Sequence, residues 1–235
     1  MELGTIERKG SLSERLARML EEGIATGALE VGAPIPSERM LAEEFRVSRT
    51  VVREAVRALV AKGLLDVRTG SGTVVTLPTA PDVAKAMSLV LMTHNDKLPY
   101  NKVSEARRII EVEVAGLAAE RRSAEDLVLL QTAVDGLVGD ALTREEFVRF
   151  DMEFHRDLAR ATGNELLLIL EESIAHVLSR VREAAFDVEG AVQSAHHHHA
   201  RLLAAVKRGD AQAAQLAMKR HLSASDRILR RVSVV

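Results

Sequence analysis

The stretch from Pro34 to Val75 constrains the fold more than any other part of the chain. Ser37 and Ser48 each place a side-chain acceptor where a helix can begin, and apolar residues follow both at helical spacing. The inward stripe of the second helix would consist of Val51, Val52, Ala55, Val56, Leu59 and Val60. Two short apolar runs then flank Thr69-Gly70-Ser71-Gly72, which predicts a β-hairpin. The stretch therefore predicts a winged helix-turn-helix.

The second of these helices has the polar residues that a recognition helix needs. Its inward stripe leaves Arg49, Thr50, Arg53 and Arg57 near its start and on its outer face. The N-terminal end of a recognition helix is the part that points at base edges and phosphates. A basic helix face is usually only solvated, and a Gly-x-Gly turn alone is weak evidence. In this order and spacing, however, the pieces together predict a unit that binds double-stranded DNA.

Four segments between about Ser11 and Val75 carry a family resemblance: SLSERLARMLEEGIATGALEVGAPIP, PSERMLAEEF, VSRTVVREAVRAL and KGLLDVRTGSGTVV. They resemble the N-terminal domain of the GntR family of bacterial transcription regulators. The resemblance implies that phosphates and bases are contacted by Arg39, Ser48, Arg49, Thr50 and Arg53, and that Gly70 enters the minor groove at the tip of the wing. Arg49 and Arg53 are the candidates for guanine readout, because a guanidinium can bond O6 and N7 together.

Length and composition are consistent with a two-domain protein of the cytoplasm. A chain of 235 residues is long enough for two domains with cores of their own. No apolar run approaches the roughly twenty residues that a membrane span needs, and the N-terminus does not resemble a signal peptide. The absence of cysteine excludes disulfides and thiolate metal sites. The net charge is −2, but phosphate binding depends on the local basic patch of the second helix and not on the total.

The chain is expected to divide into a winged helix-turn-helix domain at 1–76, a linker at 77–81 and a helical domain at 82–235. Ser123 with Asp126, and Thr143 with Glu146, have the spacing of helix-capping boxes. Helices are expected at 82–93, 103–121, 123–138, 143–161 and 165–186, followed by one that ends near residue 208 and one that ends near residue 232. The fold class is therefore mainly α, with a C-terminal all-α bundle of six or seven helices.

Four polar residues fall on faces of the bundle that the apolar pattern predicts to be buried. They are Asp151, His155, His199 and His221. One carboxylate and three imidazoles are costly to bury unpaired, and a divalent cation would satisfy all four together. A single inward histidine is more often a hydrogen-bonded core residue, and His196, three residues from His199, is a competing ligand.

A second resemblance covers about residues 82–232. The segments EARRIIEVEVAGLAAERR, FDMEFHRDLARATGNELL and HARLLAAVKRGDAQAAQLAMKRHL are similar to the ligand-binding (FCD) domain of the FadR-like branch of the GntR family. That resemblance implies a divalent metal, for which Zn, Ni and Mn all fit, and it assigns the ligands to Asp151, His155, His199 and His221. It also implies that Arg107 holds a carboxylate of an effector. An ion pair with Glu111, four residues on, is the alternative for Arg107, and the two roles are not exclusive.

Together these features predict a ligand-responsive transcription regulator, a repressor that senses a small organic or sugar acid at a metal site and is not an enzyme. A homodimer would place two recognition helices on a palindromic operator. One alternative is a metal-dependent hydrolase fused to a DNA-binding module, since the same ligands could activate a water. Another is a metal-free regulator that responds to an acyl-CoA.

Overall fold

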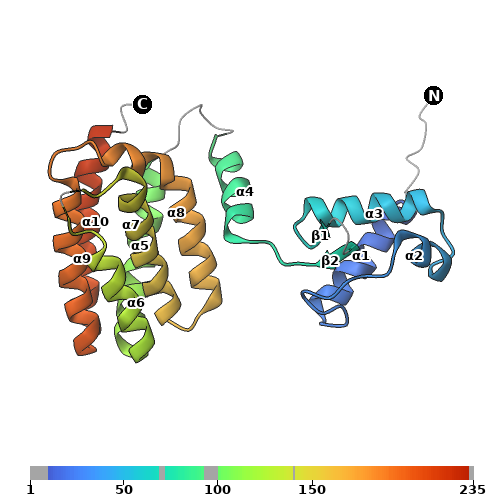
Figure 1. The fold of residues 1–235 in the computed structure, drawn as a ribbon, viewed down its shortest axis with the longest axis horizontal. Helices are drawn as coiled ribbons and strands as arrows, with labels where there is room; N and C mark the ends of the chain where they lie inside the picture. The colour runs from blue at the N-terminus through green and yellow to red at the C-terminus, as the bar shows by residue number, and fades with distance from the viewer. Residues whose placement is uncertain (1–9, 69–71, 93–99, 140, 233–235) are drawn as a thin grey trace, which may run out of the picture. The chain divides into compact units, whose positions relative to one another are not determined.

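The computed structural model describes residues 10–68, 72–92, 100–139 and 141–232. Over these residues it contains ten α-helices and one two-stranded sheet (Figure 1). The chain divides into two compact units, Met1–Thr79 and Ala80–Val235. The predicted fold class, a winged helix-turn-helix followed by a helical bundle, is confirmed.

The first unit is built from three helices and a hairpin. The elements are α1 (Leu12–Ala25), α2 (Glu38–Glu44), α3 (Arg49–Ala61), β1 (Leu65–Arg68) and β2 (Gly72–Val75). The two strands pair antiparallel, with Leu65 opposite Val75 and Arg68 opposite Gly72. The predicted hairpin is therefore confirmed, whereas the turn at 69–71, which includes Gly70, lies outside the described residues.

Helices α2 and α3 begin where their serines predict. The hydroxyl of Ser37 accepts a hydrogen bond from the backbone N–H of Met40, and that of Ser48 accepts one from Val51, each at 3.3 Å. These bonds satisfy amide groups that have no partner inside the helix.

The buried stripe of α3 is narrower than the sequence predicted. Its fully buried members are Val52, Ala55, Val56 and Leu59. Val51 is half-buried and Val60 is 38% exposed, so the prediction was wrong for Val60. At 100° per residue both valines lie about 90° from the centre of the stripe, where a helix face turns toward water.

The second unit has seven helices in its described part, as predicted. They are α4 (Ala80–Met92), α5 (Tyr100–Arg121), α6 (Ala124–Asp135), α7 (Arg144–Ala161), α8 (Glu165–Ala185), α9 (Ala191–Arg208) and α10 (Ala211–Val232). Because α4 begins at Ala80, the last two residues of the expected linker are helical. Pro81 lies in the first turn, where the missing N–H of proline costs no hydrogen bond.

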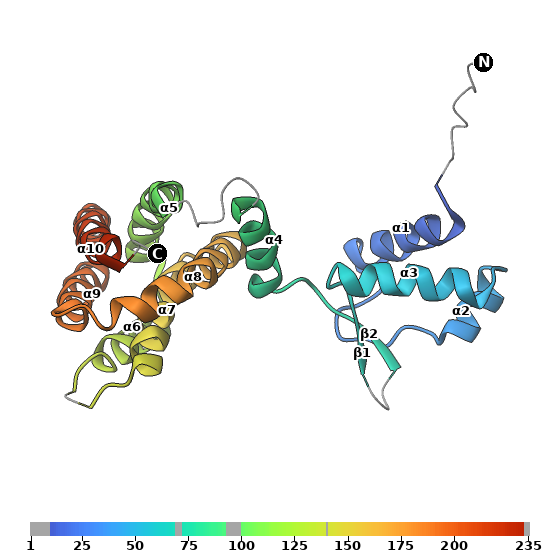
Figure 2. The same cartoon turned by 90° about the horizontal axis from the view of Figure 1, so that it is seen from above.

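Five helices, α5, α7, α8, α9 and α10, surround the interior of the bundle. Helix α10 packs against α5 and α9, α7 packs against α6 and α8, and α4 packs against α8 (Figures 1 and 2). The main apolar core includes Phe154, Leu158, Leu202 and Met218, all fully buried. The inner faces of α5, α7, α8, α9 and α10 also bring several polar side chains into this interior. None of the described helices is both long enough and apolar enough to cross a lipid bilayer.

Candidate metal centre

Three histidines from three helices meet inside the bundle. His155 on α7, His199 on α9 and His221 on α10 are at most 4% exposed. The Nε2 atoms of His155 and His221 are 3.2 Å apart, and one ring nitrogen of each histidine lies within 4.8 Å of the others. The ring of His199 is also stacked on Phe154, with 4.1 Å between the ring centroids. Apolar packing therefore fixes the imidazoles side by side.

Asp151 lies next to this trio, one turn before His155 on α7. Its Oδ1 atom is 3.6 Å from Nε2 of His199, and its Oδ2 atom is 2.8 Å from Nε of Arg182 on α8. Burial alone would raise the pKa of the Asp151 carboxyl, but the charge of Arg182, together with smaller contributions from neighbouring basic groups, holds that pKa below its usual value. The structure thus brings the four predicted ligands together, while their binding of a metal stays a prediction.

The donor set fits a divalent cation. Both ring nitrogens of His199 are buried and have no hydrogen-bond partner among the described residues. Burial lowers the pKa of His199 to about 3 and that of His221 well below its usual value, so both imidazoles are neutral, which is the form that binds metals. Two nitrogens on one tetrahedral zinc ion lie about 3.3 Å apart, since each bond is about 2.0 Å. The observed 3.2 Å between His155 and His221 is close to that separation.

Arg107 and Glu111 on α5 form a buried ion pair beside His155. The Nε atom of Arg107 donates to Oε1 of Glu111, and its Nη2 atom donates to Oε2 at 3.3 Å. Burial would raise the pKa of Glu111, but the contacts with Arg107 and His155 together outweigh it and lower that pKa. This is the alternative partner that the sequence allowed for Arg107.

Glu111 also approaches the metal centre directly. Its Oε2 atom lies 2.9 Å from Nδ1 of His155, the ring nitrogen that does not face His221. The distance is that of a hydrogen bond, although Nδ1 lacks the alignment of one, so the contact is best described as electrostatic. A carboxylate in this position favours the tautomer of His155 that leaves Nε2 free to bind a cation.

Glu171 on α8 is a buried acid that lacks hydrogen-bond partners. It is 1% exposed, and neither of its carboxylate oxygens has a hydrogen-bond partner among the described residues. Burial, and then the charge of Glu111, raise the pKa of Glu171 to about 7. Glu111, His155 and Glu171 form a second group with the spacing of metal ligands. The three histidines are the better site, because Arg107 already neutralises Glu111 and its charge would repel a cation.

Sequence reasoning did not identify Glu171 and Arg182, although a signal was present. Both lie on the same face of α8 as the buried Ile174 and Leu178, so two charged residues interrupt an apolar stripe. Charged residues at such positions are almost never fully buried without a partner, and this makes them candidates for a site.

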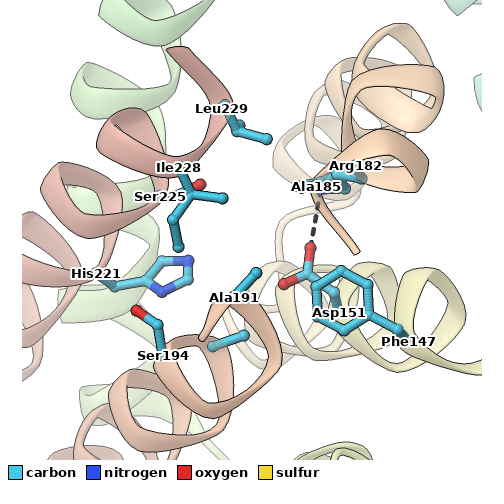
Figure 3. A pocket seen from close by; sticks show the side chains of 11 residues that line it. Phe147, Asp151, Arg182, Ala185, Ala191, Ser194, His221, Ser225, Ile228 and Leu229 are labelled. Carbon is cyan, nitrogen blue, oxygen red and sulfur yellow. Dashed lines mark ion pairs between the residues drawn. The ribbon is translucent and has the colours of Figure 1, made fainter. Parts of the chain in front are cut away.

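A cavity opens beside Asp151 and His221 (Figure 3). Its volume is about 40 Å³, and it is partly open to solvent. The polar side chains that line it are those of Asp151, Arg182, Ser194, His221 and Ser225. Arg107 does not line this cavity.

The remaining histidines have simpler surroundings. His196 is half-buried and is not part of the trio, whereas His197 and His176 are exposed. His94 lies outside the described residues. Geometry therefore favours His199 over His196 as the member of the cluster.

The predicted DNA contacts lie on the surface of the first unit. Arg39, Ser48, Arg49, Thr50 and Arg53 are all exposed. Arg39 pairs with Glu43 at 2.7 Å, and Arg53 pairs with Glu38 at 3.4 Å. Such exposed pairs contribute about 0–1 kcal/mol, so both guanidinium groups remain available to phosphates or bases.

Comparison with known proteins covers both units. Residues 12–75 match the model for bacterial regulatory proteins of the gntR family, and residues 102–224 match the FCD domain. The chain is 33% identical over 211 residues to the HTH-type transcriptional regulator LutR of Bacillus subtilis, covering 88% of this chain and 95% of LutR. It is 28% identical over 225 residues to the galactonate operon transcriptional repressor of Escherichia coli, covering 94% of this chain and 98% of the repressor.

The chain is also similar in fold to a solved structure of a GntR protein. The Streptococcus agalactiae GntR structure has a TM-score of 0.67 and 26% identity, covering 92% of this chain and 99% of that one. The resemblances stated from the sequence are therefore confirmed in both halves. The chain belongs to the GntR family of bacterial regulatory proteins, and is a DNA-binding transcription regulator whose second unit is an FCD domain.

Proposed function

We propose that this regulator is a repressor whose FCD domain binds a divalent metal and responds to a small organic or sugar acid. The observation that carries the proposal is the buried cluster of three histidines with Asp151 beside it, at the edge of a small cavity. The relative from Escherichia coli is named for galactonate, which is a sugar acid. The similarity extends over 94% of this chain and 98% of that repressor, which supports an effector of the same chemical class.

The metal would be held by Asp151, His155, His199 and His221, with Zn, Ni or Mn as candidates. A bound divalent ion supplies positive charge and open coordination positions suited to a carboxylate oxygen. The protein itself supplies buried imidazoles, a carboxylate oriented by Arg182, and a small cavity lined by Asp151 and His221. Arg107 remains a candidate for contact with the effector, in competition with its pair to Glu111.

In the first unit, Arg39, Ser48, Arg49, Thr50, Arg53 and Gly70 would contact double-stranded DNA. A homodimer would present two copies of α3 to the half-sites of a palindromic operator. The effector must bind the DNA-binding and the released arrangements with different affinities, because otherwise it could not switch them. Neither the hydrolase nor the acyl-CoA alternative is favoured by a contact among the described residues.

Replacing His199 and His221 together with alanine tests the metal centre. Two of the four donors disappear, so we expect the metal content of the purified chain to fall from about one zinc per chain to near none. Elemental analysis after dialysis against excess zinc measures this, and His197→Ala is the matched control because His197 is exposed on the same helix. One zinc per chain retained by the double variant would refute the assignment.

A further inference from the structure

The α9–α10 groove is a hollow between the last two helices of the bundle, with a volume of about 290 Å³. Helices α9 and α10 pack against each other and are joined at Gly209 and Asp210, so they run antiparallel (Figure 1). Only these two helices contribute to its described lining. The lining residues are His198, Arg201, Ala204, Ala205, Arg208, Ala213, Leu216, Ala217 and Arg220.

Three arginines give the α9–α10 groove its charge. Arg201, Arg208 and Arg220 are all exposed, and none of their side chains forms a hydrogen bond or an ion pair with another described residue. No acid is among the described lining residues. Asp210, two residues after Arg208, accepts a hydrogen bond from the backbone N–H of Ala213 at 2.9 Å and so caps α10. The groove therefore gathers three unpaired positive charges in a chain whose net charge is −2.

The arginines are spaced so that one anion can reach two of them. Arg201 and Arg220 lie at similar distances along the chain from the turn between α9 and α10, so antiparallel packing places them on facing walls. Arg208 lies two helical turns from Arg201 on α9, about 10 Å at a rise of 1.5 Å per residue. One end of the groove thus offers two guanidinium groups and the other end a third.

Small apolar residues form the rest of the groove. Ala204, Ala205, Ala213 and Ala217 lie among the arginines, and Leu216, which is 49% exposed, adds an apolar side chain. Short alanine side chains keep the facing helix surfaces low, and an apolar ligand face that covers them is removed from water. A volume of about 290 Å³ is at the lower end of the range for small-molecule sites and is too small for a DNA duplex.

We propose that the α9–α10 groove binds a small organic phosphate, a molecule with a phosphate ester and a planar, largely apolar part. A phosphate carries a charge of about −1.5 to −2 at pH 7 and three acceptor oxygens, so it can engage two guanidinium groups at once. Arg201 and Arg220 bind the phosphate, the planar part covers the alanines, and Arg208 contacts polar groups at the far end. The site is separate from the candidate metal centre, and the proposal does not depend on the metal or on an organic-acid effector.

Calorimetric titration of the full chain with AMP tests the groove. Adenosine lacks the phosphate and inorganic phosphate lacks the planar part, so we expect each to bind at least about tenfold more weakly than AMP. Glucose 6-phosphate has the same phosphate on a ring covered with hydroxyl groups, and it should also bind more weakly. Raising the salt concentration should weaken AMP binding, because the arginines are exposed.

Two variants remove the proposed phosphate contacts in different ways. Arg201→Gln combined with Arg220→Gln should lower AMP affinity by about tenfold or more. Ala204→Glu keeps every arginine but adds a negative charge to the groove, and it should also lower the affinity. All three positions are exposed, so we expect wild-type melting temperatures, which separate loss of the contact from loss of the fold.

Arg230→Gln is the matched control, because Arg230 is an exposed arginine of α10 that does not line the groove, and its AMP affinity should stay within about threefold of wild type. Wild-type AMP affinity in the Arg201 and Arg220 double variant would overturn the proposal. So would adenosine or glucose 6-phosphate binding as tightly as AMP, or no binding of AMP by the wild-type chain at about 1 mM. An equal loss of AMP affinity in Arg49→Gln would place the ligand on the DNA-binding unit and would also overturn it.

Discussion

Burial sets the protonation state of side chains in the candidate metal centre. His199 has no acid close enough for a hydrogen bond, because Asp151 is 3.6 Å away and already paired with Arg182. Desolvation therefore dominates and lowers the pKa of His199 to about 3. Glu111 is buried to the same extent but stays charged, because Arg107 is in direct contact with its carboxylate. The same low dielectric environment thus produces a neutral imidazole and a charged carboxylate within one cluster.

At the residue scale, the contact between Glu111 and His155 leads us to expect that Glu111 strengthens the binding of a metal by His155. Glu111→Gln removes the charge that orients His155, and loss of such a carboxylate typically weakens metal binding by about 10- to 100-fold. Competition for zinc with a chromophoric chelator measures the effect. Glu120→Gln, at an exposed position of the same helix, is the control. Equal zinc affinity in the two variants would show that Glu111 does not orient the ligand.

At the scale of single elements, helix α8 carries two charged side chains into the interior of the bundle. One face carries Glu171 and Arg182 into the interior, and the helix also packs against α4. The hydroxyl of Ser173 donates to the carbonyl of Ile169 at 2.6 Å, and its Oγ atom also lies 3.3 Å from the carbonyl of Ala80, the first residue of α4. Any shift of α8 on ligand binding would therefore reach the helix that follows the linker.

The capping box of α6 predicts a pH-dependent stability. Burial would raise the pKa of Asp126, but hydrogen bonds from the backbone and hydroxyl of Ser123 outweigh it and lower that pKa. A carboxyl with a lowered folded-state pKa stabilises above its unfolded pKa of about 3.9, and this contribution is lost as the pH falls through the folded value.

Asp126→Asn should therefore lower the free energy of unfolding at pH 7 by about 0.5–1 kcal/mol, a range reduced for solvent screening. The difference from wild type should persist at pH 5 and shrink below about pH 4, where the wild-type carboxyl becomes protonated. Urea unfolding across this pH range is the measurement, with Asp135→Asn at the other end of α6 as the control. A difference that stays constant down to pH 3 would contradict the role given to the charge.

At the scale of the whole molecule, the chain joins a DNA-binding unit to a helical FCD domain. The first unit has its own apolar core, which includes Leu41, Val52 and Leu59, and the second has another around Phe154 and Met218. Each unit can therefore keep its fold while the other binds a partner. This independence is what allows one family to combine a similar DNA-binding unit with different effectors.

Arg49→Ala tests the DNA-binding function of the complete protein. Loss of one bidentate contact to guanine should weaken operator binding by about 1–3 kcal/mol, which is about 5- to 150-fold. The operator can be selected from random duplexes by the wild-type chain, and gel-shift titration at fixed salt then compares the variants. Arg18→Ala removes one exposed positive charge from α1 of the same unit and should have a much smaller effect. Equal losses in both variants would mean that Arg49 contributes only general charge.

The sequence alone determines the positions of most helices and the two-domain organisation, because these depend on residues that are close together in the chain. Serine caps, capping boxes and apolar periodicity predicted nearly all helix positions, and the spacing of Asp151 and His155 placed them on one helix face. Family motifs identify the two domains and the four candidate ligands, Asp151, His155, His199 and His221, from the sequence alone.

Only the tertiary structure decided which side chains from distant helices meet. His199, and not His196, lies beside His155. Arg107 forms an ion pair with Glu111, and Arg182 on α8 forms one with Asp151 on α7. Periodicity indicates which face of a helix is buried but not which neighbour that face meets, since the neighbour depends on how all the helices pack. The pairing of charges inside the bundle follows from that packing.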